Sequence, residues 1–216
     1  MAEDRVRELA DRIEAVRRAH PVRVAIDGVD AAGKTTLAEA LALVLRRRGR
    51  EVVRASIDGF HRPRAERYRR GELSPEGYYL DSFDYDALRD ALLDPLGPGG
   101  SRAYRRAVFD YRDDAPRAEP VSHASEDAIL LFDGVFLLRP ELVEHWDLRI
   151  FVSVEPEEAL RRALERDAAV FGSQEEAERR YRRRYQPGQR LYFAEARPVV
   201  AAEVVFRTGR AGPVPR

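Results

Sequence analysis

The chain is constrained most by the stretch Gly28-Val29-Asp30-Ala31-Ala32-Gly33-Lys34-Thr35, which matches the phosphate-binding pattern G-x-x-x-x-G-K-[ST] at every position. A β-branched run over residues 22–26 precedes it and predicts a buried strand, and residues 36–48 follow with apolar side chains at helical spacing. Strand, glycine turn and helix, in this order, are the context that a phosphate loop requires. The loop N–H groups and the start of the helix attract phosphate oxygens. We therefore expect the chain to bind a nucleoside triphosphate through Gly28, Val29, Asp30, Ala31, Ala32, Gly33, Lys34, Thr35 and Thr36.

Two side chains of this loop have a predicted chemical role. Lys34 is placed to reach the β- and γ-phosphates of ATP, and the hydroxyl of Thr35 to ligate Mg²⁺. The competing interpretation is an ordinary strand-to-helix turn with an incidental lysine, and it explains neither the complete motif nor its surroundings. ATP and Mg²⁺ are accordingly the expected cofactors.

The composition narrows the class of protein further. Lysine and arginine together number 38, as do aspartate and glutamate, so the formal net charge is zero. A dedicated nucleic-acid binder usually carries a net basic surface, so we expect no nucleic-acid partner. The sequence contains no cysteine, which excludes disulfides and thiolate metal sites. The most apolar stretch, 128–138, is too short to cross a bilayer. We expect a soluble cytoplasmic protein without a membrane partner, whose oligomeric state, a homo-oligomer included, stays open.

Further strands place acidic residues at the same edge of the sheet. Residues 51–57 predict a second strand directly followed by Asp58, and an apolar run that begins near residue 127 predicts another strand with Asp133 at its end. In an open parallel sheet, ligands bind beyond the carboxyl ends of the strands. Asp58 is thus expected beside the phosphate loop, where a catalytic carboxylate is needed, and Asp133 has the form of a Walker B acid.

Strands alternate with helical patterns along the chain, which predicts an α/β fold with a parallel sheet flanked by helices. We expect one P-loop domain over residues 1–216, since no linker is long enough to divide it. Its parts are an N-terminal helix over 1–20, an aromatic and acidic insert over 60–115 that would bind the acceptor, and an arginine-rich region over 157–190. Most of these arginines are expected to form a solvated charged face, and a minority to form a lid over phosphates.

Several groups of residues together resemble the uridine kinase, phosphoribulokinase and pantothenate kinase group of P-loop kinases. They are the phosphate loop, the Asp-Gly-Phe-His run at 58–61, the Asp-Ser-Phe-Asp run at 81–84, and the stretches 109–111, 131–134 and 161–167. The resemblance runs in order from Val22 to Phe206. It implies an ATP-dependent kinase that phosphorylates a hydroxyl of a small metabolite, with a nucleoside- or nucleotide-kinase-like fold and an arginine-rich lid.

The resemblance also implies roles for single residues. Asp58 would take the proton from the acceptor hydroxyl, which agrees with the need of phosphoryl transfer for one proton acceptor. The alternative for Asp58 is a residue that only caps or turns the loop at Gly59. Asp133 would help to hold Mg²⁺ through water, at a position where uridine kinases tend to carry glutamate. Arg162 and Arg166 would stabilise charge on the transferred phosphoryl group.

The acceptor is less closely specified than the reaction. Five candidate pocket residues have polar groups that could bind its hydroxyls: His61, Tyr78, Asp81, Asp110 and Tyr111. Uridine kinases carry an aspartate near the position of Tyr78, and a histidine at the position of Asp114. A nucleoside such as uridine or cytidine is therefore expected from overall similarity, with a pantothenate- or sugar-like alcohol as the alternative. A nucleotide-dependent switch NTPase is the alternative of a different class.

Overall fold

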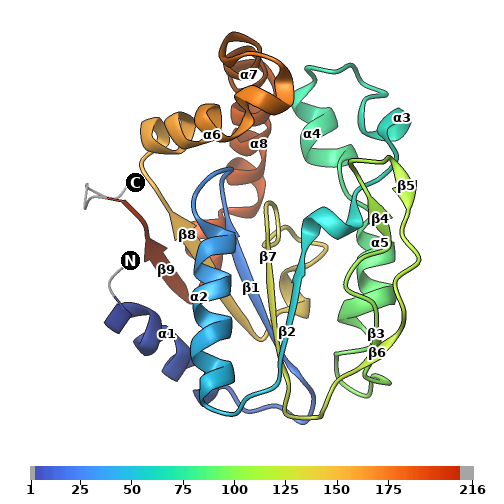
Figure 1. Ribbon diagram of the computed structural model, residues 1–216, viewed down its shortest axis with the longest axis vertical. Coiled ribbons are helices and arrows are strands. Elements are labelled where there is room, and N and C mark those ends of the chain that lie inside the picture. The colour runs from blue at the N-terminus through green and yellow to red at the C-terminus, as the bar shows by residue number, and fades with distance from the viewer. Residues whose placement is uncertain (1–2, 210–216) are drawn as a thin grey trace.

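A five-stranded sheet forms the centre of the molecule, in the order β2-β7-β1-β8-β9 (Figure 1). The computed structural model describes residues 3–209, so residues 1–2 and 210–216 of the predicted domain lie outside the description. The strands are β1 (Val22–Gly28), β2 (Val52–Ser56), β7 (Ile129–Gly134), β8 (Leu148–Ser153) and β9 (Val204–Arg207). Every neighbouring pair is parallel. The predicted α/β fold with a parallel sheet flanked by helices is confirmed.

Helices connect the strands and extend above the carboxyl edge of the sheet (Figure 1). The α-helices are α1 (Glu3–Ala15), α2 (Lys34–Arg47), α3 (Arg64–Arg67), α4 (Pro75–Asp81), α5 (Tyr85–Leu88), α6 (Pro156–Phe171), α7 (Gln174–Arg180), α8 (Gln186–Ala196) and α9 (Pro198–Ala201). The 3-10 helices are η1 (Ile57–Phe60) and η3 (Val143–His145), and the π-helices are η2 (Arg89–Leu93) and η4 (Tyr181–Tyr185). None of the helices within residues 3–209 is long and apolar enough to cross a membrane.

Two short antiparallel ladders lie between β2 and β7, and their last strands extend beyond the insert predicted over 60–115. In the first, β3 (Ala103–Tyr104) pairs with β6 (Ser122–His123), and in the second, β4 (Phe109–Asp110) pairs with β5 (Ala115–Pro116). Residues 103–111, which we call the arm, are therefore divided between two ladders.

Both faces of the main sheet are buried, which is typical of parallel strands. Along β1, Val24 and Ile26 pack on one face together with the apolar residues of α1 and α2. Ala25 points to the other face, where Phe132 of β7 joins a cluster that includes the insert and Tyr192 of α8. The loops at the carboxyl ends of the strands thus start from a rigid core.

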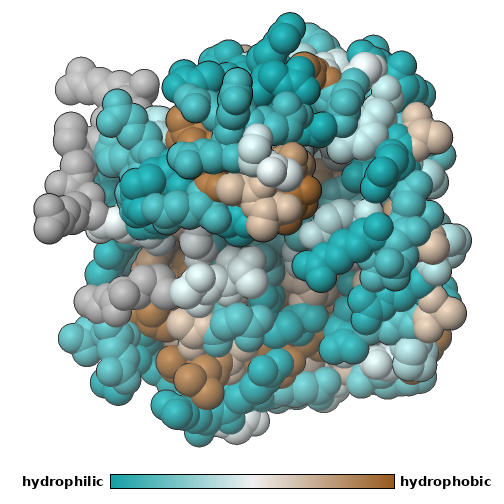
Figure 2. Space-filling model, turned by 45° about the horizontal axis from the view of Figure 1, so that its top comes forward, coloured by the Kyte–Doolittle hydropathy of each residue, from teal (hydrophilic) through white to brown (hydrophobic). Residues whose placement is uncertain are grey.

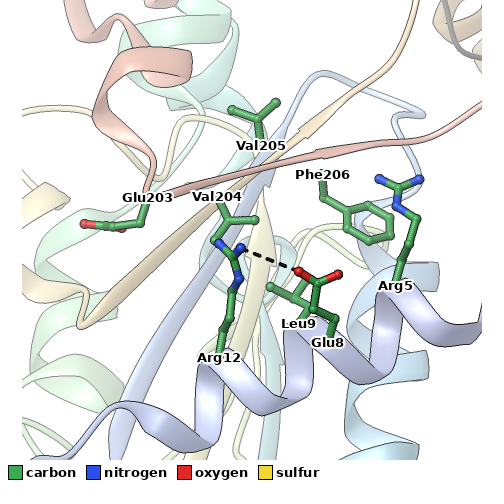
Figure 3. A pocket seen from close by; sticks show the side chains of 8 residues that line it. All are labelled: Arg5, Glu8, Leu9, Arg12, Glu203, Val204, Val205 and Phe206. Carbon is green, nitrogen blue, oxygen red and sulfur yellow. Dashed lines mark ion pairs between the residues drawn. The ribbon is translucent and has the colours of Figure 1, made fainter.

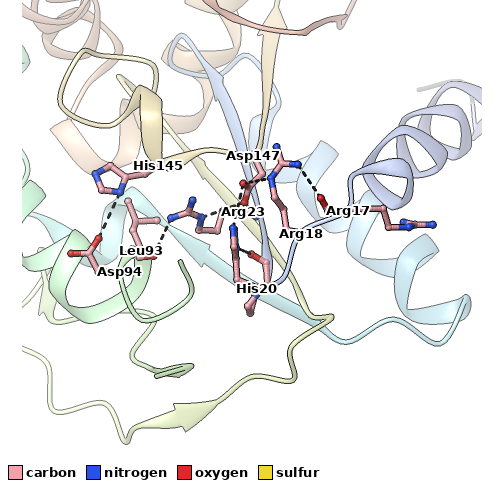
Figure 4. Close-up of polar contacts among 9 residues, drawn as sticks. Arg17, Arg18, His20, Arg23, Leu93, Asp94, His145 and Asp147 are labelled. Carbon is pink, nitrogen blue, oxygen red and sulfur yellow. Dashed lines mark hydrogen bonds and ion pairs between the residues drawn. The ribbon is translucent and has the colours of Figure 1, made fainter. Parts of the chain in front are cut away.

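The N-terminal helix ends at Ala15, earlier than the predicted end at residue 20. The non-helical residues that follow bring Arg18 and His20 against Asp147, which is buried just before β8 (Figure 4). The Asp147 carboxylate accepts hydrogen bonds from the Arg18 side chain and the Arg23 backbone N–H, both at 2.9 Å. These contacts hold the beginnings of β1 and β8 together, at the edge of the sheet opposite the phosphate loop.

Candidate functional site

The phosphate loop joins β1 to α2 through two glycines. Gly28 has a φ of 155°, and a Cβ atom there would lie 2.6 Å from the carbonyl oxygen of Val152 in β8. Gly33 has a φ of 92°, in the left-handed region that favours glycine, and stands at the N-cap of α2 without offering a side-chain cap. The first N–H groups of a helix have no partner inside it. The loop therefore presents N–H groups that suit a phosphate, as its sequence predicts.

Lys34 is the cation of this loop. Its Nζ donates a 2.7 Å hydrogen bond to the carbonyl oxygen of Val29, which holds the side chain back over the loop. Burial lowers the pKa of Lys34, and four carboxylates act in the opposite direction: Asp30, Asp27, Asp133 and Asp58. The acids of the site thus surround the lysine to which a phosphate would bind.

Thr35 and Asp133, the predicted Mg²⁺ ligands, are in direct contact. The Thr35 hydroxyl donates a 2.6 Å hydrogen bond to Oδ2 of Asp133, and Arg54 donates to the other carboxylate oxygen at 2.7 Å. In the part of the chain that the structure describes, no group of three or more histidine or acidic side chains is arranged to hold a metal alone. One hydroxyl and one carboxylate fit Mg²⁺, which keeps several waters and shares its shell with phosphates.

Asp58 follows β2 and lies in the 3-10 helix η1, at the same edge of the sheet as the phosphate loop. The cap of η1 is Ser56, whose Oγ accepts a 3.3 Å hydrogen bond from the Asp58 N–H. The Asp58 side chain is exposed, and among residues 3–209 its carboxylate accepts no hydrogen bond. The geometry therefore gives the capping role to Ser56 and leaves the carboxylate of Asp58 available.

An aromatic group stands beside Asp58. The ring of His61 lies 4.6 Å from that of Phe83 and 4.8 Å from that of Tyr111, measured between centroids. Burial lowers the pKa of His61, so its ring is neutral near pH 7. The arm that carries Tyr111 approaches η1 closely, since a Cβ atom on Gly59 would lie 2.7 Å from the Cβ of Ala107. Two of the predicted pocket residues are thus brought together, His61 and Tyr111.

Asp81 and Asp110 are engaged in other contacts. Asp81 is 3% exposed, and its two oxygens accept hydrogen bonds from Arg69 at 2.5 Å and Arg70 at 2.8 Å. The two oxygens of Asp81 thus hold the arginines that follow α3, and an acceptor-binding role for Asp81 stays a prediction. Oδ1 of Asp110 accepts the backbone N–H of Arg112 at 2.9 Å, which lowers the pKa of Asp110 and shapes the turn between β4 and β5.

The arginine-rich region forms α6, α7 and η4 at the top of the molecule, where the surface in Figure 2 is largely hydrophilic. Arg162 donates to Glu158 at 2.7 Å, and Arg166 donates to Asp167 at 2.7 Å. Other arginines pair with glutamates one turn earlier or later in the sequence: Arg161, Arg179 and Arg182. Such exposed pairs contribute little to stability, which agrees with the prediction of a solvated charged face for most of this region.

Arg184 differs from its neighbours, because it is buried. It donates to the carbonyl oxygens of Glu72 at 3.1 Å and Ser74 at 3.2 Å, and so ties η4 to the insert. This role has no local sequence pattern, since Arg184 follows two exposed arginines, Arg182 and Arg183.

Asp27 is a residue of the site that sequence reasoning missed. It is fully buried at the end of β1, and its Oδ2 accepts a 2.6 Å hydrogen bond from the Tyr192 hydroxyl of α8. Its Oδ1 accepts the N–H of Leu137 at 3.3 Å. Burial raises the pKa of Asp27 to about 6. The sequence signal that could have revealed this residue is an acid within a strand that is otherwise predicted to be buried.

A groove of about 240 Å³ lies elsewhere, between α1 and β9 (Figure 3). Its lining consists of Arg5, Glu8, Leu9, Arg12, Glu203, Val204, Val205 and Phe206. None of these belongs to the phosphate loop or to the insert, and Arg12 is paired with Glu8 at 3.6 Å. The groove is therefore separate from the candidate site.

A strand, a glycine loop that opens a helix, and a strand-end acid bonded to the threonine of that helix together define a P-loop nucleotide-binding protein. The profile of the Phosphoribulokinase / Uridine kinase family matches residues 24–192. Since this is well over half of the sequence, the chain belongs to the Phosphoribulokinase / Uridine kinase family. The predicted resemblance is confirmed.

Individual relatives are distant. The chain is 27% identical over 154 residues to Uridine-cytidine kinase B of Dictyostelium discoideum, covering 71% of this chain and 61% of that protein. It is 30% identical over 139 residues to Pantothenate kinase of Limosilactobacillus fermentum, covering 62% of this chain and 42% of that protein. The chain thus spans less than two thirds of either relative. A solved structure from Bacillus stearothermophilus, described as a "Possible Uridine Kinase", has a TM-score of 0.73 and 25% identity, covering 94% of this chain and 97% of that one.

Proposed function

We propose that this chain transfers the γ-phosphoryl group of ATP to a hydroxyl of a small metabolite in the cytoplasm. The observation that supports this most directly is the place of Asp58 relative to the phosphate loop. Its carboxylate is exposed and lies directly after β2, the next strand along the chain. It also acts electrostatically on Lys34. A kinase needs a proton acceptor at this place, whereas a nucleotide-dependent switch does not.

In the proposed reaction, the acceptor oxygen forms a bond to the γ-phosphorus of ATP and gives its proton to Asp58, while the bond to the ADP oxygen breaks. Lys34 and the loop N–H groups hold the phosphates. Thr35 and Asp133 would hold Mg²⁺, which neutralises phosphate charge when bound. Arg162 and Arg166 would approach from α6 and stabilise the transferred group once their present carboxylate partners are exchanged for phosphate.

A nucleoside such as uridine or cytidine is the acceptor that we propose. The family and a relative named Uridine-cytidine kinase B support it, as do the aromatic rings of His61 and Tyr111, since aromatic side chains can pack against a heterocycle. A pantothenate- or sugar-like alcohol is the alternative, because Tyr78 and Asp114 depart from the uridine kinase pattern.

A screen for ADP release tests the proposal. The purified chain with ATP and Mg²⁺ is given uridine, cytidine, pantothenate, fructose or glycerol, and the Lys34→Ala variant serves as the matched control. We expect ADP release to depend on one class of acceptor, and the acceptor to gain the mass of one phosphoryl group. Equal ADP release with and without every acceptor would favour the switch NTPase over a kinase.

A further inference from the structure

The phosphate loop of this chain carries a carboxylate, Asp30, that the proposed reaction does not use. Its Oδ2 accepts two hydrogen bonds, from the Tyr78 hydroxyl at 2.9 Å and from Nε2 of Gln189 at 2.8 Å. Tyr78 belongs to α4 of the insert and Gln189 to α8, so both walls beside the loop converge on this one oxygen. A carboxylate in a phosphate-binding loop repels the bound phosphates, which costs binding free energy. We therefore expect Asp30 to have a function that offsets this cost.

Neither donor neutralises the charge of Asp30. A tyrosine hydroxyl and a carboxamide are neutral, and within residues 3–209 Asp30 forms no ion pair. Its second oxygen, Oδ1, accepts no hydrogen bond from the described residues, and Asp30 is only half-buried. One carboxylate oxygen thus remains available where the loop, the insert and α8 meet.

The charges around this oxygen favour a neutral ligand. Asp30 and Asp58 both act on Lys34, and that lysine is needed by the phosphates. Of two nearby arginines, Arg184 is held by backbone carbonyl groups, and Arg166 is assigned by the proposed reaction to the transferred phosphoryl group. An acceptor with its own carboxylate or phosphate would meet two acids there, whereas a hydroxyl can donate a hydrogen bond to Oδ1.

We propose that Asp30 accepts a hydrogen bond from a second hydroxyl of the acceptor and thereby selects neutral, polyhydroxylated acceptors over acidic ones. The inference rests on the proposed kinase function and specifies its acceptor class. Tyr78 and Gln189 are positioning residues in this arrangement, because their bonds to Oδ2 fix the carboxylate and leave Oδ1 exposed to the acceptor.

The test compares acceptors that differ by one carboxylate: uridine with 5-carboxyuridine, panthenol with pantothenate, and glycerol with D-glycerate. KM and kcat are measured for the wild type and for Asp30→Asn, which keeps an oxygen that accepts from Tyr78 and Gln189 but removes the charge. The wild type should prefer the neutral member of the pair that it phosphorylates by at least about tenfold in kcat/KM. In Asp30→Asn, KM for the neutral acceptor should rise about ten- to a hundredfold and the preference should shrink by a similar factor, with little change in kcat.

Two further variants distinguish a direct effect of Asp30 on the choice of acceptor from a general effect of surface charge or of loop packing. Asp90→Asn makes the same change of charge on the exposed surface of η2 and should leave the preference unchanged. Gln189→Leu removes one donor to Oδ2 without changing charge, and should reduce the preference for neutral acceptors less than Asp30→Asn does, because Tyr78 still holds the carboxylate. The affinity for MgATP is measured in all variants by calorimetry. It should stay within about threefold of the wild type in Asp90→Asn and Gln189→Leu, and should not fall in Asp30→Asn, because that change removes an acid that repels phosphate.

The outcomes are distinguishable. An Asp30→Asn variant with an unchanged preference, or a wild type that prefers the acidic member, would overturn this inference and leave the kinase proposal standing. A wild type that phosphorylates none of the acceptors of this panel or of the ADP-release screen would overturn the proposed function and this inference with it.

Discussion

Tyr192 of α8 donates a 2.6 Å hydrogen bond to Asp27, the residue directly before the first glycine of the phosphate loop. The two residues are 165 positions apart in the sequence. Asp27 is fully buried, and Lys34 stands near enough to favour its ionised form. The strand that carries the loop is therefore fixed to α8 through a carboxylate whose protonation depends on pH.

The first prediction concerns the pH dependence of stability. The pKa of Asp27 is raised from 3.8 to about 6 in the folded chain, with burial as the main cause. Between these values the folded state binds a proton that the unfolded state has lost, so Asp27 destabilises the fold increasingly as the pH rises through this window. The full loss is about 3 kcal/mol by linkage. In Asp27→Asn this contribution is absent.

Urea unfolding of wild type and Asp27→Asn at pH 4, 5, 6 and 7 checks this. The difference in the free energy of unfolding between the two proteins should shift in favour of Asp27→Asn as the pH rises, and should level off above pH 6 to 7. A difference that is constant from pH 4 to 7 would contradict a raised pKa for Asp27.

Much of the site follows from local sequence, because its parts are ends of strands. The phosphate loop, Asp58 and Asp133 are each predicted by a short motif, and the parallel sheet brings the three to one edge. The role of Arg54 cannot be predicted in this way, although Arg54 donates to Asp133 at 2.7 Å. Buried and half-buried side chains alternate along β2, and this pattern does not indicate which strand lies beside Arg54.

The acceptor side is less accessible to reasoning from sequence, for a physical reason. Its residues come from short helices and two-residue ladders whose packing is decided by tertiary contacts. Asp81 follows no local pattern that reveals its partners, and only the packing of the turn after α3 against α4 shows that Arg69 and Arg70 donate to its oxygens. The bond of Tyr78 to Asp30 joins residues 48 positions apart and has no local pattern.

The second prediction is that Lys34→Ala loses turnover while the fold persists. Lys34 is the only lysine of the sequence, and its Nζ contacts the loop rather than the core. Turnover should fall by at least about a hundredfold, as expected for a lost preorganised donor to the phosphates. The free energy of unfolding should change by no more than about 1 kcal/mol, the contribution of one hydrogen bond. Near wild-type turnover in a folded Lys34→Ala protein would remove the lysine from the mechanism.

The third prediction concerns motion of the lid region. Helix α6 buries only Ala159 and Ala163, and α7 only Ala177, so their local stability should be low. We expect amides over 156–180 to exchange quickly in the free chain and slowly when MgATP and the acceptor are both bound. Helix α8 is the internal control, since Tyr192 anchors it to Asp27. Equal protection of α6 and α7 in the free and bound states would count against a lid.

The last prediction is that Asp58→Asn separates binding from chemistry. The change keeps the size of the side chain and removes the proton acceptor, so turnover should fall by about two to four powers of ten, the usual contribution of a positioned general base. Affinity for MgATP should persist, because the phosphate loop is untouched, and KM for the acceptor should rise only modestly. The melting temperature should also persist, since Ser56 rather than Asp58 caps η1.

A matched variant makes this experiment decisive. Ser56→Ala removes the cap of η1 and should cost about 1 kcal/mol of stability, as lost N-caps do, with a small effect on turnover. Asp58→Asn should show the reverse pattern, a large loss of turnover at nearly constant stability. If Asp58→Asn instead keeps turnover within about threefold of the wild type, far short of a general-base effect, the carboxylate is not the base. The nucleotide-dependent switch NTPase then becomes the better hypothesis.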